Sequence, residues 1–277
     1  GGQEKVTRQH DRGKLDIRQR LDLLLDDDSF HEVGKIAGTA SYDDDGKLVD
    51  LRASNFVFGR GLVDGSPVVV AGDDFTVRGG AADASIVTKQ IAAEHMAFEL
   101  RLPIIRLIDG TGGGGSVKTL DTKAQSSGSV ATGSMGRGAR TYVPANPAWE
   151  HVVANLATVP TVALCLGPVA GLGAARAVSS HFSVMVRGLS QLFVAGPPVV
   201  NALGAEEVDK ESLGGSGIHT RNGAIDHAVD SEEEAFQAAR RFLSYLPSSV
   251  HQLAERGPVT DDPDRRDDLL GDIVPRD

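Results

Sequence analysis

The feature that most constrains this chain is a run of four glycines within "IDGTGGGGSV" (108–117), which directly follows the apolar stretch "PIIRLID" (103–109). The short apolar stretch predicts a buried strand. Glycines after such a strand leave the backbone N–H groups unshielded by any side chain. The run is therefore expected to be a loop whose bare backbone does chemistry, and not a flexible linker.

Two nucleotide-binding patterns come close to this run and fail. Its glycines satisfy the dinucleotide pattern G-x-G-x-x-G, but positions 130–140 contain no Asp or Glu that could hold a ribose. The stretch "GGGGSVKT" (112–119) is one residue short of a phosphate-binding P-loop, because Val117 occupies the place of the final glycine. A β-branched residue resists the sharp turn needed there. Nucleotide chemistry is therefore disfavoured.

A second glycine-rich turn, "GPVAGLGAA" (167–175), follows another apolar strand, "TVALCLG" (161–167). There Gly171 and Gly173 open a helix of small residues, which adds the positive end of a helix dipole. Two glycine-lined N–H sites, each at the end of a strand, suit the developing negative oxygen of a thioester enolate. Removing one such donor typically costs roughly 3–4 kcal/mol of transition-state stabilisation.

The rest of the chain alternates between apolar strands, glycine turns and helices, which predicts an α/β layered core. The stretch 14–30 predicts a helix with a capping box between Asp16 and Gln19 and an apolar stripe that docks on the core. Helices are also expected within 84–103, 146–160 and 231–247, strands within 161–167, 181–188 and 190–197, and a hairpin turn at 64–67.

Finer expectations concern individual side chains on these elements. His95 lies on the apolar stripe of its helix and is expected to be hydrogen-bonded and partly buried, and not a ligand. A second capping box is expected between Ser231 and Glu234. Arg176 and His181 are expected at a helix surface or cap, and Asp109 in a turn. The buried face of the helix within 146–160 is expected to comprise Trp149, Val152, Val153 and Leu156.

Composition excludes several classes of protein. The formal net charge of −10 disfavours binding to nucleic acid, whose phosphates require a basic surface. The single cysteine, Cys165, lies in an apolar run and predicts a packed core thiol in a cytoplasmic protein. No apolar run approaches the roughly 20 residues of a membrane span. The sequence shows no Ser/His/Asp triad, no metal-ligand spacing and no paired glutamates, so no metal is expected.

The chain resembles the N-terminal half of the carboxyltransferase (beta) subunit of biotin-dependent acyl-CoA carboxylases, such as the propionyl-CoA and methylcrotonoyl-CoA carboxylases. The motifs that carry the resemblance follow the family order over nearly the whole chain. They are "GKLDIRQRLDLLLDDDSFHE" (13–32), "DFTVRGG" (74–80), "IDGTGGGGSV" (108–117), "GPVAGLGAA" (167–175), "SQLFVAGPPVV" (190–200), "LGGSGIHTRNGAIDH" (213–227) and "LSYLPSS" (243–249).

The resemblance implies a crotonase-like fold of stacked β-β-α units, in which backbone amides hold an acyl-CoA thioester. Carboxybiotin, carried by a partner subunit or domain, would release CO2 beside the substrate, and the substrate enolate would attack it. The family's two oxyanion motifs fall on residues 111–114 and 170–173 of this sequence. The catalytic amides implied are those of Gly112, Gly113, Gly114, Gly171 and Gly173.

For coenzyme A, the resemblance implies a path along the 74–80 turn and the basic segment 110–148. The residues implied are Phe75, Arg78, Gly79, Gly80, Lys118, Arg137 and Arg140. For the last three, a solvated basic lid is an equally good interpretation. The family also implies a biotin-carrying alpha subunit as partner and a homo-oligomer, a hexamer built as a trimer of dimers.

The expected organisation is an N-terminal docking region (1–33), a crotonase-like core (34–250) and the start of a linker to a missing C-terminal domain (251–277). Family active sites form between the N-domain of one subunit and the C-domain of another, so this part alone is expected to be inactive. Leu172 departs from the second glycine motif. Three alternatives stay open: an acyl-CoA hydratase or isomerase of the same fold, a decarboxylase that runs the same site in reverse, and a non-catalytic assembly subunit, for which Leu172 and the missing half would be the evidence.

Overall fold

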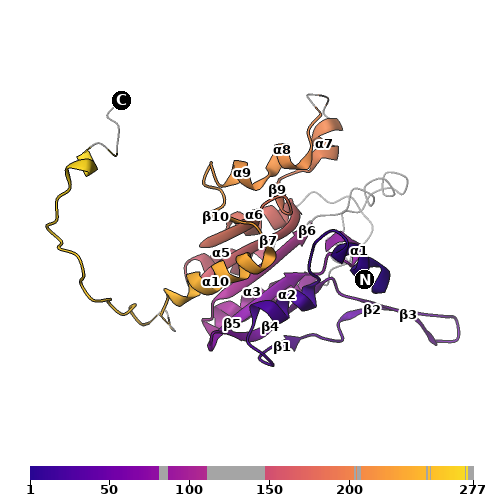
Figure 1. Cartoon of the computed structure of the whole chain (residues 1–277). Helices are drawn as coiled ribbons and strands as arrows, with labels where there is room; N and C mark the ends of the chain where they lie inside the picture. Colours follow the sequence, from indigo (N-terminus) through magenta and orange to yellow (C-terminus); the bar gives the residue numbers. More distant parts are fainter. Residues whose placement is uncertain are drawn as a thin grey trace.

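A computed structural model of the chain describes residues 1–80, 87–110, 147–202, 204, 207–247, 249, 251–271 and 273. Its centre is an eight-stranded sheet with the order β1-β4-β5-β6-β7-β8-β10, and β9, which is off this path, pairs with the last residues of β7 (Figure 1). The strands from β5 to β10 along this path run parallel, and β1, β4 and β5 are antiparallel. The strands are β1 (His31–Val33), β4 (Phe56–Val63), β5 (Ser66–Asp73), β6 (Ile104–Gly110), β7 (Thr161–Ala170), β8 (Phe182–Val186), β9 (Gln191–Phe193) and β10 (His227–Val229). A separate hairpin pairs β2 (Gly38–Tyr42) with β3 (Leu48–Ala53).

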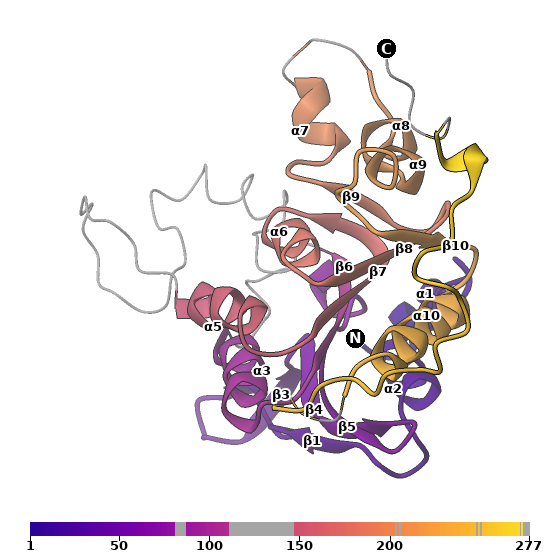
Figure 2. The same ribbon diagram turned by 90° about the vertical axis from the view of Figure 1, so that its left-hand side faces the viewer.

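Helices cover both faces of the sheet. In Figure 2, α3 (Val87–Leu100) and α5 (Pro147–Leu156) lie on one face, and α2 (Ile17–Leu24) and α10 (Glu232–Ser244) lie on the other. The shorter helices lie around this core and at the ends of the chain. They are α1 (Gln3–His10), α6 (Leu172–Val178), α7 (Pro197–Ala202), α8 (Lys210–Gly214), α9 (Ser216–His219) and the 3-10 turns η1 (Arg78–Gly80) and η3 (Asp268–Gly271).

The two-residue period of the central strands divides the core into two layers. In β6, Ile105 and Leu107 pack in the cluster under α2 and α10, whereas Ile104 packs in the cluster under α3. Cys165 of β7 is buried on the second face, as expected, and burial raises its pKa to about 12. The central strands are therefore covered on both sides, which explains why they read as continuous apolar runs.

The first predicted helix forms as expected. Asp16 caps α2 and forms the reciprocal capping box with Gln19, and its stripe of Ile17, Leu21 and Leu24 is buried against the sheet. The predicted hairpin joins β4 to β5 through Asp64 and Gly65, both with positive φ. The predicted α/β layered fold is therefore confirmed.

Three finer expectations are wrong in part. Val153 is 60% exposed, because α5 turns its Val152 and Asn155 towards the core instead. His95 is exposed: its imidazole lies 3.3 Å from Glu99 and meets the ring of His151 edge-on. The second capping box is only half formed.

In α10, Ser231 accepts from the Glu234 N–H as expected, but the Glu234 carboxylate accepts from the N–H of Asp230, one residue before the cap. Two side chains therefore still cap this end of the helix: Ser231 accepts from the Glu234 N–H, and Glu234 accepts from the Asp230 N–H. Among the described residues, no helix is long and apolar enough to cross a membrane. The predicted domain boundaries at 33 and 250 stay predictions.

Candidate functional site

Three segments singled out in the sequence follow three neighbouring parallel strands. The 74–80 turn comes directly after β5, Gly110 ends β6, and Gly171 follows β7. Since β5, β6 and β7 are adjacent and parallel, their carboxyl ends meet at one edge of the sheet. Gly110 pairs with Val169, two residues before Gly171. We call this the carboxyl edge, the position at which open α/β sheets bind ligands.

Glycines allow the first two of these segments to touch. Gly80 has φ +71, and a Cβ added to it would lie 2.5 Å from the Asp109 carbonyl oxygen. Gly110 has φ +104, and its Cβ would lie 2.3 Å from the Gly79 carbonyl oxygen. No larger residue fits either position without displacing backbone, so the turn after β5 is held against the strand that leads into the glycine run.

The third segment presents backbone donors. Gly171 has φ 63 and precedes α6, in a conformation that favours glycine, and it offers no side-chain cap. The first N–H groups of a helix have no partner within the helix, which leaves those of Leu172 and Gly173 directed out of its first turn. The N–H of Gly171 itself donates to the Phe193 carbonyl at 3.0 Å. The expectation that the Gly171 amide is free is therefore wrong.

A buried ion-pair cluster supports this edge from below. The Lys14 Nζ lies 2.7 Å from Oδ1 and 2.6 Å from Oδ2 of Asp109. Arg20 donates to Oδ2 of the same carboxylate at 2.9 Å and to Glu232 at 2.6 Å. Arg20 and Asp109 are completely buried. Asp109 is thus a paired strand residue, and the expectation that it forms a turn is wrong.

The cluster reaches the site itself. The Lys14 ammonium lies 4.3 Å above the centre of the Phe75 ring. Burial lowers the pKa of Lys14 from its usual value, although Asp109 opposes that shift. Gly167 makes room for the pair, because a Cβ there would lie 2.1 Å from an Asp109 carboxylate oxygen. Lys14 and Asp109 therefore tie the N-terminal segment, the 74–80 turn and β6 together.

A second buried cluster lies on the α3 face of the sheet. Arg106 of β6 forms a two-point ion pair with Glu94 of α3, at 2.8 and 2.9 Å. Arg176 of α6 is buried, 3.8 Å from the same Glu94. Arg176 is therefore a core cation. The sequence-based expectation that it lies on a helix surface or cap is wrong. One of its nitrogens, Nη1, has no hydrogen-bond partner among the described residues.

Asp73 connects the two clusters. It is the last residue of β5, it is buried, and one of its carboxylate oxygens accepts from the Asp109 N–H at 3.2 Å. Burial raises the pKa of Asp73 to about 6, although the charge of Arg176 opposes the shift. Asp73 therefore titrates near neutral pH, directly below the edge.

The predicted site residues fall into three groups. Phe75, Arg78, Gly79 and Gly80 lie together in the turn at the carboxyl edge, with Arg78 exposed and Phe75 half-buried. Gly173 lies in the first turn of α6, which follows β7 at the same edge. Gly112, Gly113, Gly114, Lys118, Arg137 and Arg140 lie outside the described residues. His181 lies at the opposite end of the sheet, where Thr161 and the Leu156 carbonyl hold its ring.

The charged supports Lys14, Arg20, Arg106 and Glu232 were not predicted from the sequence. Two signals pointed to them: Arg106 and Asp109 interrupt an apolar strand, and a charge inside a buried strand requires a partner. Among the described residues, no group of three or more His, Cys, Asp or Glu side chains is arranged to hold a metal ion. The edge therefore offers backbone donors and buried charge.

Comparison with known proteins agrees with this architecture. A family model described as the carboxyl transferase domain matches residues 8–277. The propionyl-CoA carboxylase carboxyltransferase subunit of Haloferax mediterranei is 32% identical over 99% of this chain and 50% of that protein. The methylmalonyl-CoA decarboxylase subunit alpha of Veillonella parvula is 29% identical over 99% of this chain and 50% of that protein.

Among solved structures, transcarboxylase 12S with methylmalonyl-coenzyme A bound matches with a TM-score of 0.74 and 27% identity. The match covers 100% of this chain and 50% of that one. This likeness confirms the crotonase-like fold. The chain spans about half the length of the relatives that it matches.

Proposed function

The chain belongs to the carboxyl transferase domain family, and we propose that it is the part of a biotin-dependent acyl-CoA carboxylase that binds acyl-CoA and stabilises its enolate. The observation that carries this proposal is the carboxyl edge. There the 74–80 turn touches the end of β6, and the first turn of α6 follows the neighbouring strand β7, with buried ion pairs beneath them.

The carboxyl edge is suited to stabilising the enolate of an acyl thioester. When the α-carbon of an acyl thioester loses its proton, negative charge develops on the thioester oxygen. The N–H groups of Leu172 and Gly173, at the positive end of α6, would donate to that oxygen. Gly171 would contribute through its glycine-only turn and not through its own N–H, which Phe193 occupies. The amides of Gly112, Gly113 and Gly114 stay predicted as the second set of donors.

Coenzyme A would lie along the 74–80 turn. Arg78 is exposed there and supplies a cation for a phosphate group, and the half-buried Phe75 supplies an apolar surface. Gly79 and Gly80 allow the turn to approach Gly110 closely, so the thioester would reach the α6 amides from the same edge. Lys118, Arg137 and Arg140 stay predicted as further contacts to the phosphates.

Biotin, carried by a partner subunit or domain, would supply the activated carboxyl group. No described residue is assigned to it, since one acyl-CoA thioester accounts for the donors at this edge. We further propose a homo-oligomer, supported by the hexamer assembly named for transcarboxylase 12S, and a cytoplasmic location. A biotin-carrying alpha subunit is the proposed partner.

Leu172→Pro tests the donors directly. Proline is well accepted at the first position of a helix, so α6 should form, but the variant lacks the Leu172 N–H. In the full-length protein with its biotin-carrying partner and propionyl-CoA, kcat should fall by about 10²–10³-fold. The matched control, Leu172→Ala, keeps the N–H and should retain activity within a few-fold. Equal rates for both variants would refute the role of this amide.

A decarboxylase is a second candidate, because the Veillonella decarboxylase subunit matches nearly the whole chain. The same donors would stabilise the same enolate in reverse, so the direction of turnover with methylmalonyl-CoA and with propionyl-CoA distinguishes the two. A hydratase or isomerase is disfavoured because Asp109 is buried and paired with Lys14 and Arg20. Wild-type protein that binds no acyl-CoA at millimolar concentration would favour the assembly-subunit alternative.

A further inference from the structure

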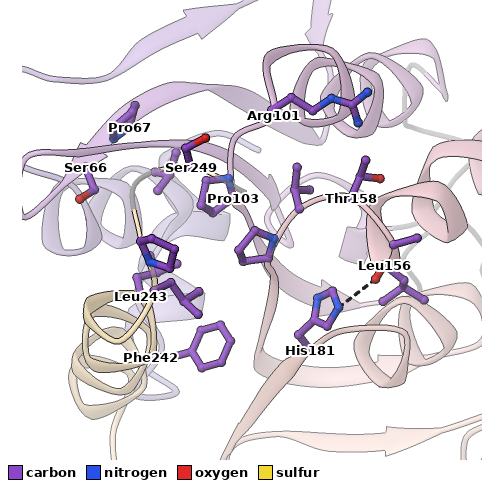
Figure 3. A pocket seen from close by; sticks show the side chains of 16 residues that line it. Ser66, Pro67, Arg101, Pro103, Leu156, Thr158, His181, Phe242, Leu243 and Ser249 are labelled. Atoms are coloured by element: carbon purple, nitrogen blue, oxygen red, sulfur yellow. Dashed lines mark hydrogen bonds between the residues drawn. The ribbon is translucent and has the colours of Figure 1, made fainter. Parts of the chain in front are cut away.

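A cavity of about 540 Å³ opens at the other end of the sheet, far along the strands from the carboxyl edge. It lies where β5, β6, β7 and β8 begin, and the end of α10 forms one wall with Phe242 and Leu243 (Figure 3). Its volume falls within the range of about 300–1,000 Å³ typical of small-molecule sites. We call it the amino-edge pocket.

Three prolines give this pocket an apolar floor. Pro67 is the second residue of β5, and Pro103 and Pro160 directly precede β6 and β7. Proline has no N–H, so the donors that normally project from the amino ends of parallel strands are missing at these positions. The carbonyls of Pro103 and Pro160 are already used, since they accept from Val69 and Ile104 at 2.8 and 2.9 Å. The floor therefore suits a hydrocarbon chain.

Arg101 supplies a cation on the wall of this pocket. It follows α3 with φ 55, and the Leu102 N–H donates to the Ala97 carbonyl, which is the geometry of a Schellman motif. Glycine is usual at this position, because other residues adopt a positive φ only at a cost. An arginine here holds its side chain at the pocket in spite of that cost.

The Arg101 guanidinium lies 4.5 Å from the centre of the Phe98 ring and pairs with no carboxylate among the described residues. The other basic group of the pocket, His181, has both ring nitrogens engaged, one by Thr161 and one by the Leu156 carbonyl. Figure 3 shows Arg101 across the pocket from Phe242 and Leu243. Of the basic groups that line this pocket in the described part of the chain, Arg101 is thus the one available to a ligand.

We propose that the amino-edge pocket binds an aliphatic carboxylate, with the carboxylate on Arg101 and the hydrocarbon chain over the prolines and α10. The cation favours a negatively charged ligand, and the floor without N–H donors favours an apolar hydrocarbon chain. This site is separate from the proposed acyl-CoA site, because it lies at the opposite ends of the same strands.

Calorimetric titration with decanoate and with decanol tests the proposal. Decanoate should bind the wild-type protein, and Arg101→Gly should weaken it about 10-fold or more, since a hydrogen bond to a charged group is lost. Glycine suits the backbone at this position, so the variant should fold normally. Decanol affinity should be equal in both proteins, and Arg101→Lys should restore part of the decanoate affinity.

Two further variants complete the design. Ala157 lines the pocket but is exposed, so Ala157→Trp should fill the pocket without disturbing the core and abolish binding of both probes. Arg187→Gln removes an exposed arginine beyond the far end of β8 and should change nothing. No decanoate binding at millimolar concentration would overturn the proposal, as would unchanged affinity in Arg101→Gly. Competition between decanoate and propionyl-CoA would also overturn it, whereas failure of acyl-CoA binding alone would bear only on the carboxyl edge.

Discussion

The two ends of the central sheet differ in the residues that form them. At the carboxyl edge, glycines with positive φ bring backbone segments together, and buried ion pairs lie beneath them. At the amino edge, prolines remove backbone donors, and Arg101 is the cation of the apolar pocket that has no carboxylate partner among the described residues. The same strands therefore present a polar, donor-rich site at one end and a donor-poor site at the other.

The two ends also differ in the role of their charged side chains. At the carboxyl edge the charged groups Lys14, Arg20 and Asp109 are turned inward, and they position the backbone instead of facing the substrate. At the amino edge the charged group, Arg101, is exposed and lines the pocket. Changes to the inward charges should therefore cost stability, and changes to the outward charge should alter binding only.

The largest effect is expected for Arg20→Met. It leaves Asp109 and Glu232 without their shared partner in the core, and breaking a buried pair typically costs about 3–5 kcal/mol of unfolding free energy. Urea denaturation measures this change. The control, Arg187→Met, breaks an exposed pair with Asp230 and should cost about 0–1 kcal/mol. Similar costs for the two variants would remove the contrast between buried and exposed charge.

Asp73 gives the next largest effect, as a dependence on pH. Its folded pKa of about 6 lies above the ordinary value of 3.8, so the folded protein holds this proton more tightly than the unfolded chain. Its stabilising contribution is full below pH 3.8 and falls as pH rises towards 6, by about 3 kcal/mol in all, and then stays constant. Asp73→Asn should remove this loss. Parallel stability curves for the variant and the wild type between pH 4 and 7 would contradict the assignment.

Gly80→Ala and Gly65→Ala separate backbone conformation from close packing. Both residues have positive φ, but only Gly80 meets backbone atoms, whereas Gly65 has open space within 4 Å. Gly80→Ala should therefore be less stable than Gly65→Ala by about 1–3 kcal/mol, the usual cost of overpacking. It should also weaken binding of propionyl-CoA, which Gly65→Ala should leave unchanged. Thermal unfolding and calorimetry provide the two readings.

The smallest effect is expected at the amino edge. Arg101→Gly relieves a positive φ but loses the contact with Phe98, and these two contributions of about 0.5–1 kcal/mol oppose each other. The unfolding free energy should stay within about 0.5 kcal/mol of the wild-type value. A loss of 2 kcal/mol or more in denaturation would show that Arg101 supports the fold and does not serve the pocket.

The layered fold and the placement of the glycine turns could be predicted from sequence, because they follow local patterns. Apolar runs and the Asp16 capping box specify elements, and glycines after strands must meet at one edge of a parallel sheet. The partners of buried charges could not be predicted in this way. Lys14 and Asp109 are 95 residues apart in sequence, and only the folded sheet brings them together.

The amide of Gly171 shows the same limit on a smaller scale. A bare glycine predicts an accessible N–H, but whether it is free depends on Phe193, which arrives from a later strand. The amino-edge pocket was likewise invisible in the sequence. Its prolines are distant from one another, and Arg101 stands where a helix-ending pattern would lead one to expect glycine.

Backbone hydrogen exchange with and without propionyl-CoA tests the central claim most directly, because it reports on both ends of the sheet in one experiment. Saturating ligand should slow exchange in the peptides that contain the 74–80 turn and the first turn of α6, Leu172 and Gly173. Exchange at Arg101 and Leu102, beside the amino-edge pocket, should not change. Protection confined to the amino edge, or none at the start of α6 under saturation, would contradict the account.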